Sequence, residues 1–415
     1  MRVKLILNRQ IRKHKNNFKT FHVTILILFS SIITANAQSK LNGMIVSQQG
    51  GPLPYSTISI KNMPIGTISN IEGKFTFSIP PKCMDDTLII SMLGYESLII
   101  PIDGLDTSQN QKFSLREKVF ELDEVTISAR QMSGEEILKE AFKRQKENLP
   151  QTNYLLDLFV RELFYFNDSC NAIVESAAQL FGRKFPRPGF DVYLDHTRYA
   201  LGRQPGLPTG LKGYNPFREF QSILGGRSRM MKPCKNCRYE IEKHIYVDNQ
   251  QAAVIALHYE SDRTYPVFRY IVGTDNYAIL KFEFETKIPF GEAFTEHHND
   301  VTSSLTSLKR TIEYRVFDNR YYLKSYRQWA GHEYRKSDGS MVYHTLHSFL
   351  VSANSIQTGN VEKLKADKAS ANLMDYRSTL FSQSSNNDPA FWENYNVVER
   401  TSEEDRLYNL LSEKQ

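Results

Sequence analysis

The densest group of side chains with binding chemistry lies between residues 183 and 238. This stretch holds twelve Lys and Arg against only Asp191, Asp195 and Glu219, and it is rich in Gly and Pro. Basic side chains bind oxyanions, and the guanidinium fork does so bidentately. We therefore expect a basic Gly/Pro-rich loop at 183–238 that binds an anionic glycan, a lipid phosphate or an acidic partner. A solvated loop is the alternative. The candidate ligand-binding residues are Arg203, Lys212, Arg227, Arg229 and Lys232.

Cys234 and Cys237 form a Cys-x-x-Cys motif at the end of the same stretch. Redox motifs of this kind place the first sulfur at a helix N-terminus, whereas an alternating, strand-like run follows Cys237. Zinc would need two further ligands, and only His244 lies close in sequence. We expect a local disulfide between the two cysteines, which suits an oxidising compartment. Free thiols or a zinc site are the alternatives.

No arrangement of nucleophile, base and acid stands out elsewhere in the sequence. It contains no Gly-x-Ser-x-Gly elbow, phosphate-binding loop or Rossmann glycine pattern. His344 and His347 are three residues apart on an expected strand, so their side chains point to opposite faces. We expect no enzymatic activity, no cofactor and no metal. The alternative is an envelope hydrolase with its site on the 183–238 loop.

The first 37 residues combine a basic start with a short apolar run. They contain seven Lys and Arg and no acid, then an apolar segment at 23–33 and Ala35-Asn36-Ala37. This pattern is typical of a secretory signal peptide cut between Ala37 and Gln38, and the apolar run is shorter than the roughly 20 residues that span a bilayer. Cleavage leaves 45 of the 52 basic residues against 46 acidic ones. We therefore expect export and no nucleic-acid partner.

Short β-type runs separated by glycine turns fill residues 38–130. They include Gly51-Pro-Leu-Pro-Tyr-Ser-Thr-Ile58, Gly66-Thr-Ile-Ser-Asn-Ile-Glu-Gly-Lys-Phe-Thr-Phe77 and Leu122-Asp-Glu-Val-Thr-Ile-Ser-Ala129. Strands at this spacing favour a β-sandwich. In this order the motifs resemble the carboxypeptidase-regulatory-like domain of Bacteroidetes envelope proteins. The resemblance implies a transthyretin/Ig-like sandwich at 38–130 and a place in the cell envelope. It is a resemblance to an accessory domain, not to a catalytic one.

Residues 131–152 have the pattern of one linker helix. Ser133 and Glu136 fit a capping box, an apolar stripe follows, and Pro150 ends the segment. Because the stripe needs an apolar surface to cover, we expect this helix to pack on the domain that follows it.

Three Asp-Asn turns mark hairpins within residues 153–375. The turns are Asp248-Asn249, Asp275-Asn276 and Asp318-Asn319, and alternating apolar runs flank each of them. Alternation on both sides of a tight turn predicts a β-hairpin. We expect a mainly β fold in which an antiparallel meander is covered by a helical lid. These strand–turn–strand units resemble those of periplasmic lipoprotein-carrier folds, which implies a hydrophobic cavity between sheet and helices.

Two further features concern the ends of this second domain. Residues 154–162 and 172–180 predict a strand pair that brings Arg161 and Glu162 near Glu175. These three positions resemble a signature of uncharacterised Bacteroidetes proteins, and an ordinary cross-strand ion pair is our preferred interpretation. In the C-terminal tail, 376–415, an aromatic cluster at 388–395 is expected to fasten the tail to the sheet.

Together these patterns predict an exported, non-catalytic protein of the periplasmic or outer-membrane face. Its role would be binding or scaffolding. The expected partners are an envelope lipid or glycan, or another envelope protein, and any association with the membrane is expected to be peripheral.

Overall fold

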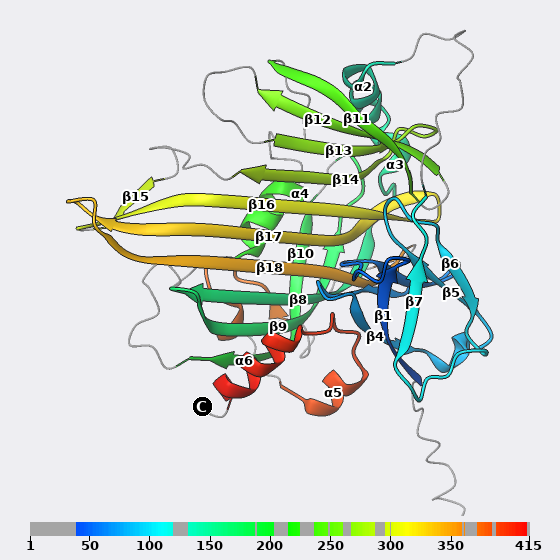
Figure 1. Cartoon of the computed structure of the whole chain (residues 1–415), viewed down its shortest axis with the longest axis horizontal. Helices are drawn as coiled ribbons and strands as arrows, with labels where there is room; N and C mark the ends of the chain where they lie inside the picture. Colours follow the sequence, from blue (N-terminus) through cyan, green and yellow to red (C-terminus); the bar gives the residue numbers. More distant parts are fainter. Residues whose placement is uncertain are drawn as a thin grey trace, which may run out of the picture.

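The computed structural model describes residues 39–118, 132–186, 189–202, 215–224, 236–247, 250–259, 267–286, 295–298, 300–358, 361, 372–383 and 387–412. The expected signal peptide and its cleavage point at Ala37 and Gln38 lie outside these ranges. The chain is mainly β, as predicted: a small N-terminal β domain precedes one large antiparallel sheet (Figure 1).

The N-terminal domain consists of two small sheets, with strand orders β4-β1-β7 and β3-β2-β5-β6. Buried Leu41, Ile45, Ile58, Phe77 and Ile90 share one core, because alternate residues of a strand face the same side. The predicted sandwich is confirmed. Its elements are β1 (Ser39–Ser47), β2 (Thr57–Ile60), β3 (Gly66–Ile68), β4 (Lys74–Ile79), the 3-10 turn η1 (Pro81–Cys83), β5 (Thr87–Ser91), β6 (Leu98–Pro101) and β7 (Gln111–Leu115).

Within the described residues the large sheet has twelve strands. Eleven follow the order β11-β12-β13-β14-β16-β17-β18-β8-β9-β10-β19, and β15 pairs with β16. The strands are β8 (Tyr154–Phe166), β9 (Ser169–Gly182), β10 (Phe190–Leu201), β11 (Cys237–Val247), β12 (Gln250–Tyr259), β13 (Val267–Gly273), β14 (Ile279–Thr286), β15 (Thr295–His298), β16 (Val301–Phe317), β17 (Arg320–Lys336), β18 (Met341–Gln357) and β19 (Asn372–Leu373).

The predicted hairpins account for much of this order. β13 pairs with β14 across the Asp275-Asn276 turn, and β16 pairs with β17 across Asp318-Asn319. Asp318 and Asn319 have φ values of 49° and 55°, the left-handed backbone that a two-residue hairpin turn requires and that Asp and Asn tolerate. β11 and β12 also pair as predicted, although their turn at Asp248-Asn249 lies outside the described residues.

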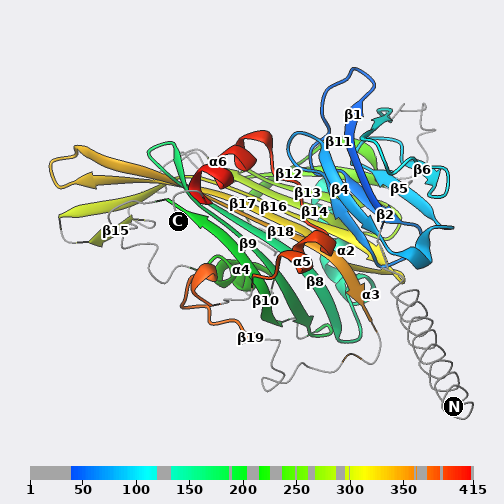
Figure 2. The same cartoon turned by 90° about the horizontal axis from the view of Figure 1, so that it is seen from below.

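Different elements cover the two faces of the large sheet (Figure 2). The helices α2 (Gly134–Lys143), α3 (Gln145–Asn148) and α4 (Phe217–Leu224) lie on one face. The sandwich, α5 (Pro389–Asn394) and α6 (Ser402–Ser412) lie on the other, and a short 3-10 turn, η5 (Leu380–Ser382), follows β19. Strand β8 shows why both faces are covered: Leu158 and Val160 belong to the helix-side core, whereas Phe159 packs with Trp392 of α5.

The prediction of one irregular loop over 183–238 is wrong. Strand β10 and helix α4 lie inside that range. Phe190, Val192 and Leu194 alternate into the core, and Phe217, Phe220 and Ile223 form a buried helical stripe. Strand β10 has 12 residues, but its alternation shifts at a bulge between Leu194 and His196. Helix α4 has only 8 residues, so neither element gave a sustained periodic signal in the sequence.

The linker helix exists but is divided into two. Ser133 caps α2, and its predicted capping box with Glu136 is present. The single predicted helix breaks at Arg144, which ends α2 and precedes the short α3. Leu149 is extended just before Pro150, which agrees with the restriction that proline places on the preceding residue.

Candidate functional site

An apolar cavity of about 380 Å³ lies between the helices and the large sheet. Strands β8, β9, β14, β16 and β17 contribute to its walls, together with the lid helices. Its size and composition are typical of sites for apolar small molecules. The described residues that line it are Ala141, Phe142, Gln145, Asn148, Leu149, Pro150, Tyr154, Leu156, Leu180, Arg183, Phe185, Gly189, Phe190, Ile223, Ile279, Tyr314, Tyr321, Tyr322 and Leu323.

Helix α2 forms one wall of the cavity and is fixed at its beginning. The Glu136 amide donates to the Ser133 hydroxyl (3.3 Å), and the Ser133 amide donates to the Glu136 carboxylate (2.8 Å). Ile137 and Leu138 then bury against the sheet. Phe142 meets Tyr270 edge-on, with ring centroids 6.2 Å apart.

Helix α4 forms the opposite part of the lid. The Asn215 side chain, just before this helix, donates to the carbonyls of Asp375 and Ser378 (3.2 and 2.9 Å). Phe220 packs edge-on against Phe190 and Tyr326, at centroid distances of 5.2 and 5.1 Å. These contacts leave Ile223 at the cavity wall.

Three cavity tyrosines, Tyr154, Tyr314 and Tyr322, have no hydrogen-bond partner for their hydroxyls among the described residues. A fourth differs, because the Tyr321 hydroxyl accepts hydrogen bonds from Asn276 (2.8 Å) and Gln250 (3.3 Å). Burial, and then the nearby Tyr322 phenol, raise the pKa of Tyr154 to about 12. Burial also raises the pKa of Tyr314 and of Tyr322. All three phenols therefore remain protonated donors at neutral pH.

Gly182 makes room for the Tyr154 ring. The two residues are cross-strand partners on β9 and β8, and a Cβ at position 182 would lie 2.1 Å from Cζ of Tyr154. The ring therefore lies across the glycine and meets Tyr322 edge-on, with centroids 5.2 Å apart. A larger residue at 182 would displace the phenol from the cavity.

Arg183 is the one charged side chain among the described residues that line the cavity. Its guanidinium pairs with Asp191 at 2.7 Å, and 42% of the Arg183 side chain is exposed. The cation thus lies at the solvent edge of an otherwise uncharged wall. Another lining residue, Asn148, donates from its side chain to the Asn276 carbonyl (3.1 Å), and this bond joins α3 to the β13–β14 turn.

The structure does not test the candidate ligand-binding residues predicted from the sequence. Arg203, Lys212, Arg227, Arg229 and Lys232 all lie outside the described residues, so their role stays a prediction. Cys237 is disulfide-bonded, while Cys83 and Cys170 are buried free thiols. Cys234 is outside the described ranges, and its pairing with Cys237 also stays a prediction.

The cavity residues were only partly visible in the sequence. Alternation places Tyr314 and Leu323 on an apolar face, and the α2 stripe predicts a lid. The unpartnered hydroxyls of Tyr154 and Tyr322 had no sequence signal, because a tyrosine at an inward position has the same pattern whether its hydroxyl is bonded or not. The Tyr154–Gly182 pairing depends on the strand register, which periodicity alone does not fix.

A charged cluster lies on the opposite face of the sheet around Glu175, which is fully buried. The predicted ion pair of Glu175 with Arg161 is confirmed at 2.6 Å, and Arg198 and Arg400 bind the same carboxylate at 2.7 and 2.5 Å. Burial alone would raise the pKa of Glu175, but the three guanidinium groups hold it well below its usual range. The cluster is therefore larger than an ordinary cross-strand pair.

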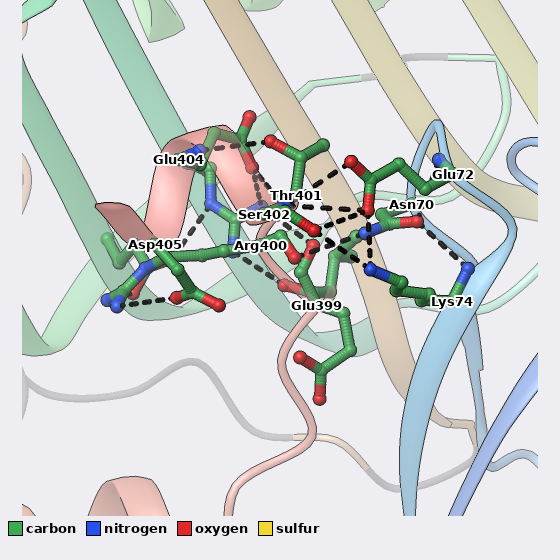
Figure 3. Close-up of polar contacts among 12 residues, drawn as sticks. Asn70, Glu72, Lys74, Glu399, Arg400, Thr401, Ser402, Glu404 and Asp405 are labelled. Carbon is green, nitrogen blue, oxygen red and sulfur yellow. Dashed lines mark hydrogen bonds and ion pairs between the residues drawn. The ribbon is translucent and has the colours of Figure 1, made fainter. Parts of the chain in front are cut away.

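The C-terminal tail joins this cluster to the sandwich (Figure 3). Arg161 donates to the carbonyls of Val398 (2.6 Å) and Glu399 (3.1 Å). On the other side, the Asn70 side chain donates to the Arg400 carbonyl (3.2 Å). The aromatic part of the tail is anchored as predicted, since the Tyr395 hydroxyl donates to the Leu158 carbonyl (2.8 Å) and Trp392 is buried.

Comparison with known proteins identifies the first domain. Residues 41–127 match the CarboxypepD_reg-like domain, which confirms the resemblance seen in the sequence. The TonB-dependent receptor P39 of Formosa agariphila is 27% identical over 117 residues, which are 28% of this chain. The chain spans 11% of that receptor's length, so the receptor's activity does not transfer to this protein.

Two solved structures of bacterial proteins show a partial similarity to this chain. A LolA superfamily protein from Nitrosomonas europaea is 13% identical, with a TM-score of 0.25, and the match covers 56% of this chain and 96% of that one. A putative outer membrane lipoprotein-sorting protein domain from Vibrio parahaemolyticus is 11% identical, with a TM-score of 0.24, covering 55% and 94%. At these scores the function has to be argued from the cavity itself.

Two searches of the described ranges bear on the chemistry. No group of three or more His, Cys, Asp or Glu side chains there is placed to hold a metal ion. None of the helices described in these ranges is long and apolar enough to cross a membrane.

Proposed function

We propose that this is a non-catalytic binding protein of the cell envelope that holds an acyl chain of a lipid in the cavity beneath α2, α3 and α4. The observation that supports the proposal is the cavity of about 380 Å³, whose walls are mainly apolar and aromatic with a few polar groups. The CarboxypepD_reg-like domain at residues 41–127 and the partial similarity to a TonB-dependent receptor support the location.

The chemistry of the walls favours a lipid over a glycan. Leu156, Leu180, Leu323 and Phe190 offer no hydrogen bonds, and Arg183 stands at the edge. A sugar in this space would leave most of its hydroxyls unpaired, at a cost of about 2 kcal/mol or more for each. An acyl chain would instead gain about 0.8 kcal/mol for each buried methylene.

Filling the cavity tests the proposal. Ala141 is a buried residue of α2 that lines the cavity, so Ala141→Trp should occupy the space of the ligand. Titration of the mature protein with dansyl undecanoic acid should show at least a tenfold loss of affinity in this variant. Lys139→Trp is the matched control, because Lys139 lies on the same helix with 62% of its side chain exposed.

Overpacking can destabilise a core by about 1–3 kcal/mol, so a second variant guards against misfolding. Ile279→Trp fills the same cavity from strand β14, and circular dichroism checks that both variants fold. Binding that is unchanged in two folded, cavity-filled variants would overturn the proposal. Absence of binding to the unmodified protein would do the same, and would favour an assembly role with another envelope protein.

A further inference from the structure

Three tyrosines of the cavity have hydroxyls that could bind the polar end of a ligand. Tyr154, Tyr314 and Tyr322 belong to three different strands, β8, β16 and β17, yet all three line the same apolar space. None of the three hydroxyls has a hydrogen-bond partner among the described residues. A ligand in the cavity can therefore supply the acceptor for each of them.

We propose that the cavity is a site for an anionic amphiphile, an acyl chain ending in a carboxylate or phosphate, whose oxygens accept hydrogen bonds from Tyr154, Tyr314 and Tyr322 while Arg183 supplies the positive charge. This inference rests on the proposed function and specifies its ligand. It assigns the polar end of the ligand to the phenols and the chain to the leucine and phenylalanine walls.

The positive charge of Arg183 favours a ligand with a negative charge. Arg183 is the one ionised group among the described lining residues, and its pairing with Asp191 engages a single nitrogen, Nη2. The guanidinium has five N–H donors in total, so it can bind a second oxyanion without releasing the first. Protonated phenols donate to such an oxyanion in an apolar environment, where hydrogen bonds to charged groups are strongest.

The position of Tyr154 supports a dedicated site. Its ring is accommodated only because residue 182 is a glycine, and it meets Tyr322 edge-on. By contrast, Tyr321 also lines the cavity, but its hydroxyl is engaged by Asn276 and Gln250. The Tyr321 hydroxyl is therefore engaged within the protein, whereas the hydroxyls of Tyr154, Tyr314 and Tyr322 are available to a ligand.

Calorimetric titration with ligands of one chain length tests the inference. Dodecanoate and dodecyl phosphate should bind at least tenfold more tightly than dodecanol, and dodecylammonium should bind most weakly. Whichever of the two anions binds more tightly identifies the head group as a carboxylate or a phosphate. The triple variant Tyr154→Phe, Tyr314→Phe, Tyr322→Phe should lose about tenfold or more in dodecanoate affinity and keep its affinity for dodecanol within about twofold.

Two controls make the outcome decisive. Tyr343→Phe removes a hydroxyl from β18, away from the cavity lining, and should leave both affinities unchanged. Arg183→Gln should reduce the preference for anions over dodecanol and leave the affinity for dodecanol itself unchanged. Equal binding of dodecanoate and dodecanol, or an intact preference in the triple variant, would overturn the inference while the proposed function stands. If no dodecyl ligand binds, the proposed function fails as well.

Discussion

At the scale of single residues, Glu175 shows how this protein buries charge. Its carboxylate accepts hydrogen bonds from Arg161, Arg198 and Arg400, so both oxygens are fully engaged. A buried ion is tolerated only where such partners compensate for lost hydration. Glu313 repeats the arrangement on β16: burial would raise its pKa, but Lys324, Arg327 and Lys281 hold it well below the usual range.

Removing the Glu175 charge should destabilise the fold. Glu175→Gln leaves three clustered guanidinium groups without their shared anion, and loss of one partner in a buried pair typically costs about 3–5 kcal/mol. We expect a decrease of that size in the free energy of unfolding, measured by urea denaturation at pH 7. Glu135→Gln, which breaks an exposed pair with Lys139, is the control and should change it by less than about 1 kcal/mol.

The lowered pKa values of Glu175 and Glu313 predict how the stability of the fold depends on pH. Because the pKa of Glu175 and of Glu313 is lowered by folding, the unfolded chain binds protons first as the pH falls. Their stabilisation is complete above the ordinary value of 4.5 and is lost progressively below it. The variant Glu175→Gln should therefore lose less stability than the unmodified protein between pH 5 and about 3. Parallel pH profiles would contradict this account.

At the scale of elements, the capping box decides where the lid over the cavity begins. Ser133→Ala removes the oxygen that accepts from the Glu136 amide, which typically costs about 1 kcal/mol. We expect a decrease of that size in the unfolding free energy, with faster amide exchange in the first turn of α2. Ser133→Asp restores the acceptor and should recover most of the loss. Equal stability of the alanine variant would show that packing of Ile137 and Leu138 alone fixes the helix.

The elements also show what the sequence can and cannot specify. The hairpins at Asp275-Asn276 and Asp318-Asn319, and the cap at Ser133, follow from local rules and were predicted. Strand β10 was missed because its alternation shifts at the bulge between Leu194 and His196. Helix α4 was missed because 8 residues form a short periodic signal. The cavity itself depends on the register that sets Tyr154 against Gly182, which is a tertiary property.

At the scale of the whole molecule, the C-terminal tail connects the two β domains. Segment 396–402 contacts the sandwich through Asn70, Glu72 and Ser78 and contacts the sheet through Arg161. A second junction is independent of the tail: the Ile356 amide donates to the Pro64 carbonyl at 2.9 Å. The Gly94 amide also donates to the Tyr246 carbonyl at 3.1 Å, so the sandwich contacts the sheet directly as well as through the tail.

Removal of the tail should loosen one of these junctions and leave the other. In a chain ending at residue 387, we expect faster hydrogen exchange at Ser78, near the end of strand β4, because its amide loses its bond to Asn396. Exchange at Ile356 should stay slow. Unchanged protection at Ser78 would mean that the tail is not what holds the sandwich in place.

The account as a whole depends on a lipid occupying the cavity. The most direct measurement is mass spectrometry of small molecules extracted from the protein after purification from the cells that produce it, beside Ala141→Trp prepared in the same way. We predict a near-stoichiometric acyl lipid with an anionic head group in the unmodified protein, and its loss from the variant. An empty unmodified protein, or the same lipid retained in the folded variant, would contradict the central claim.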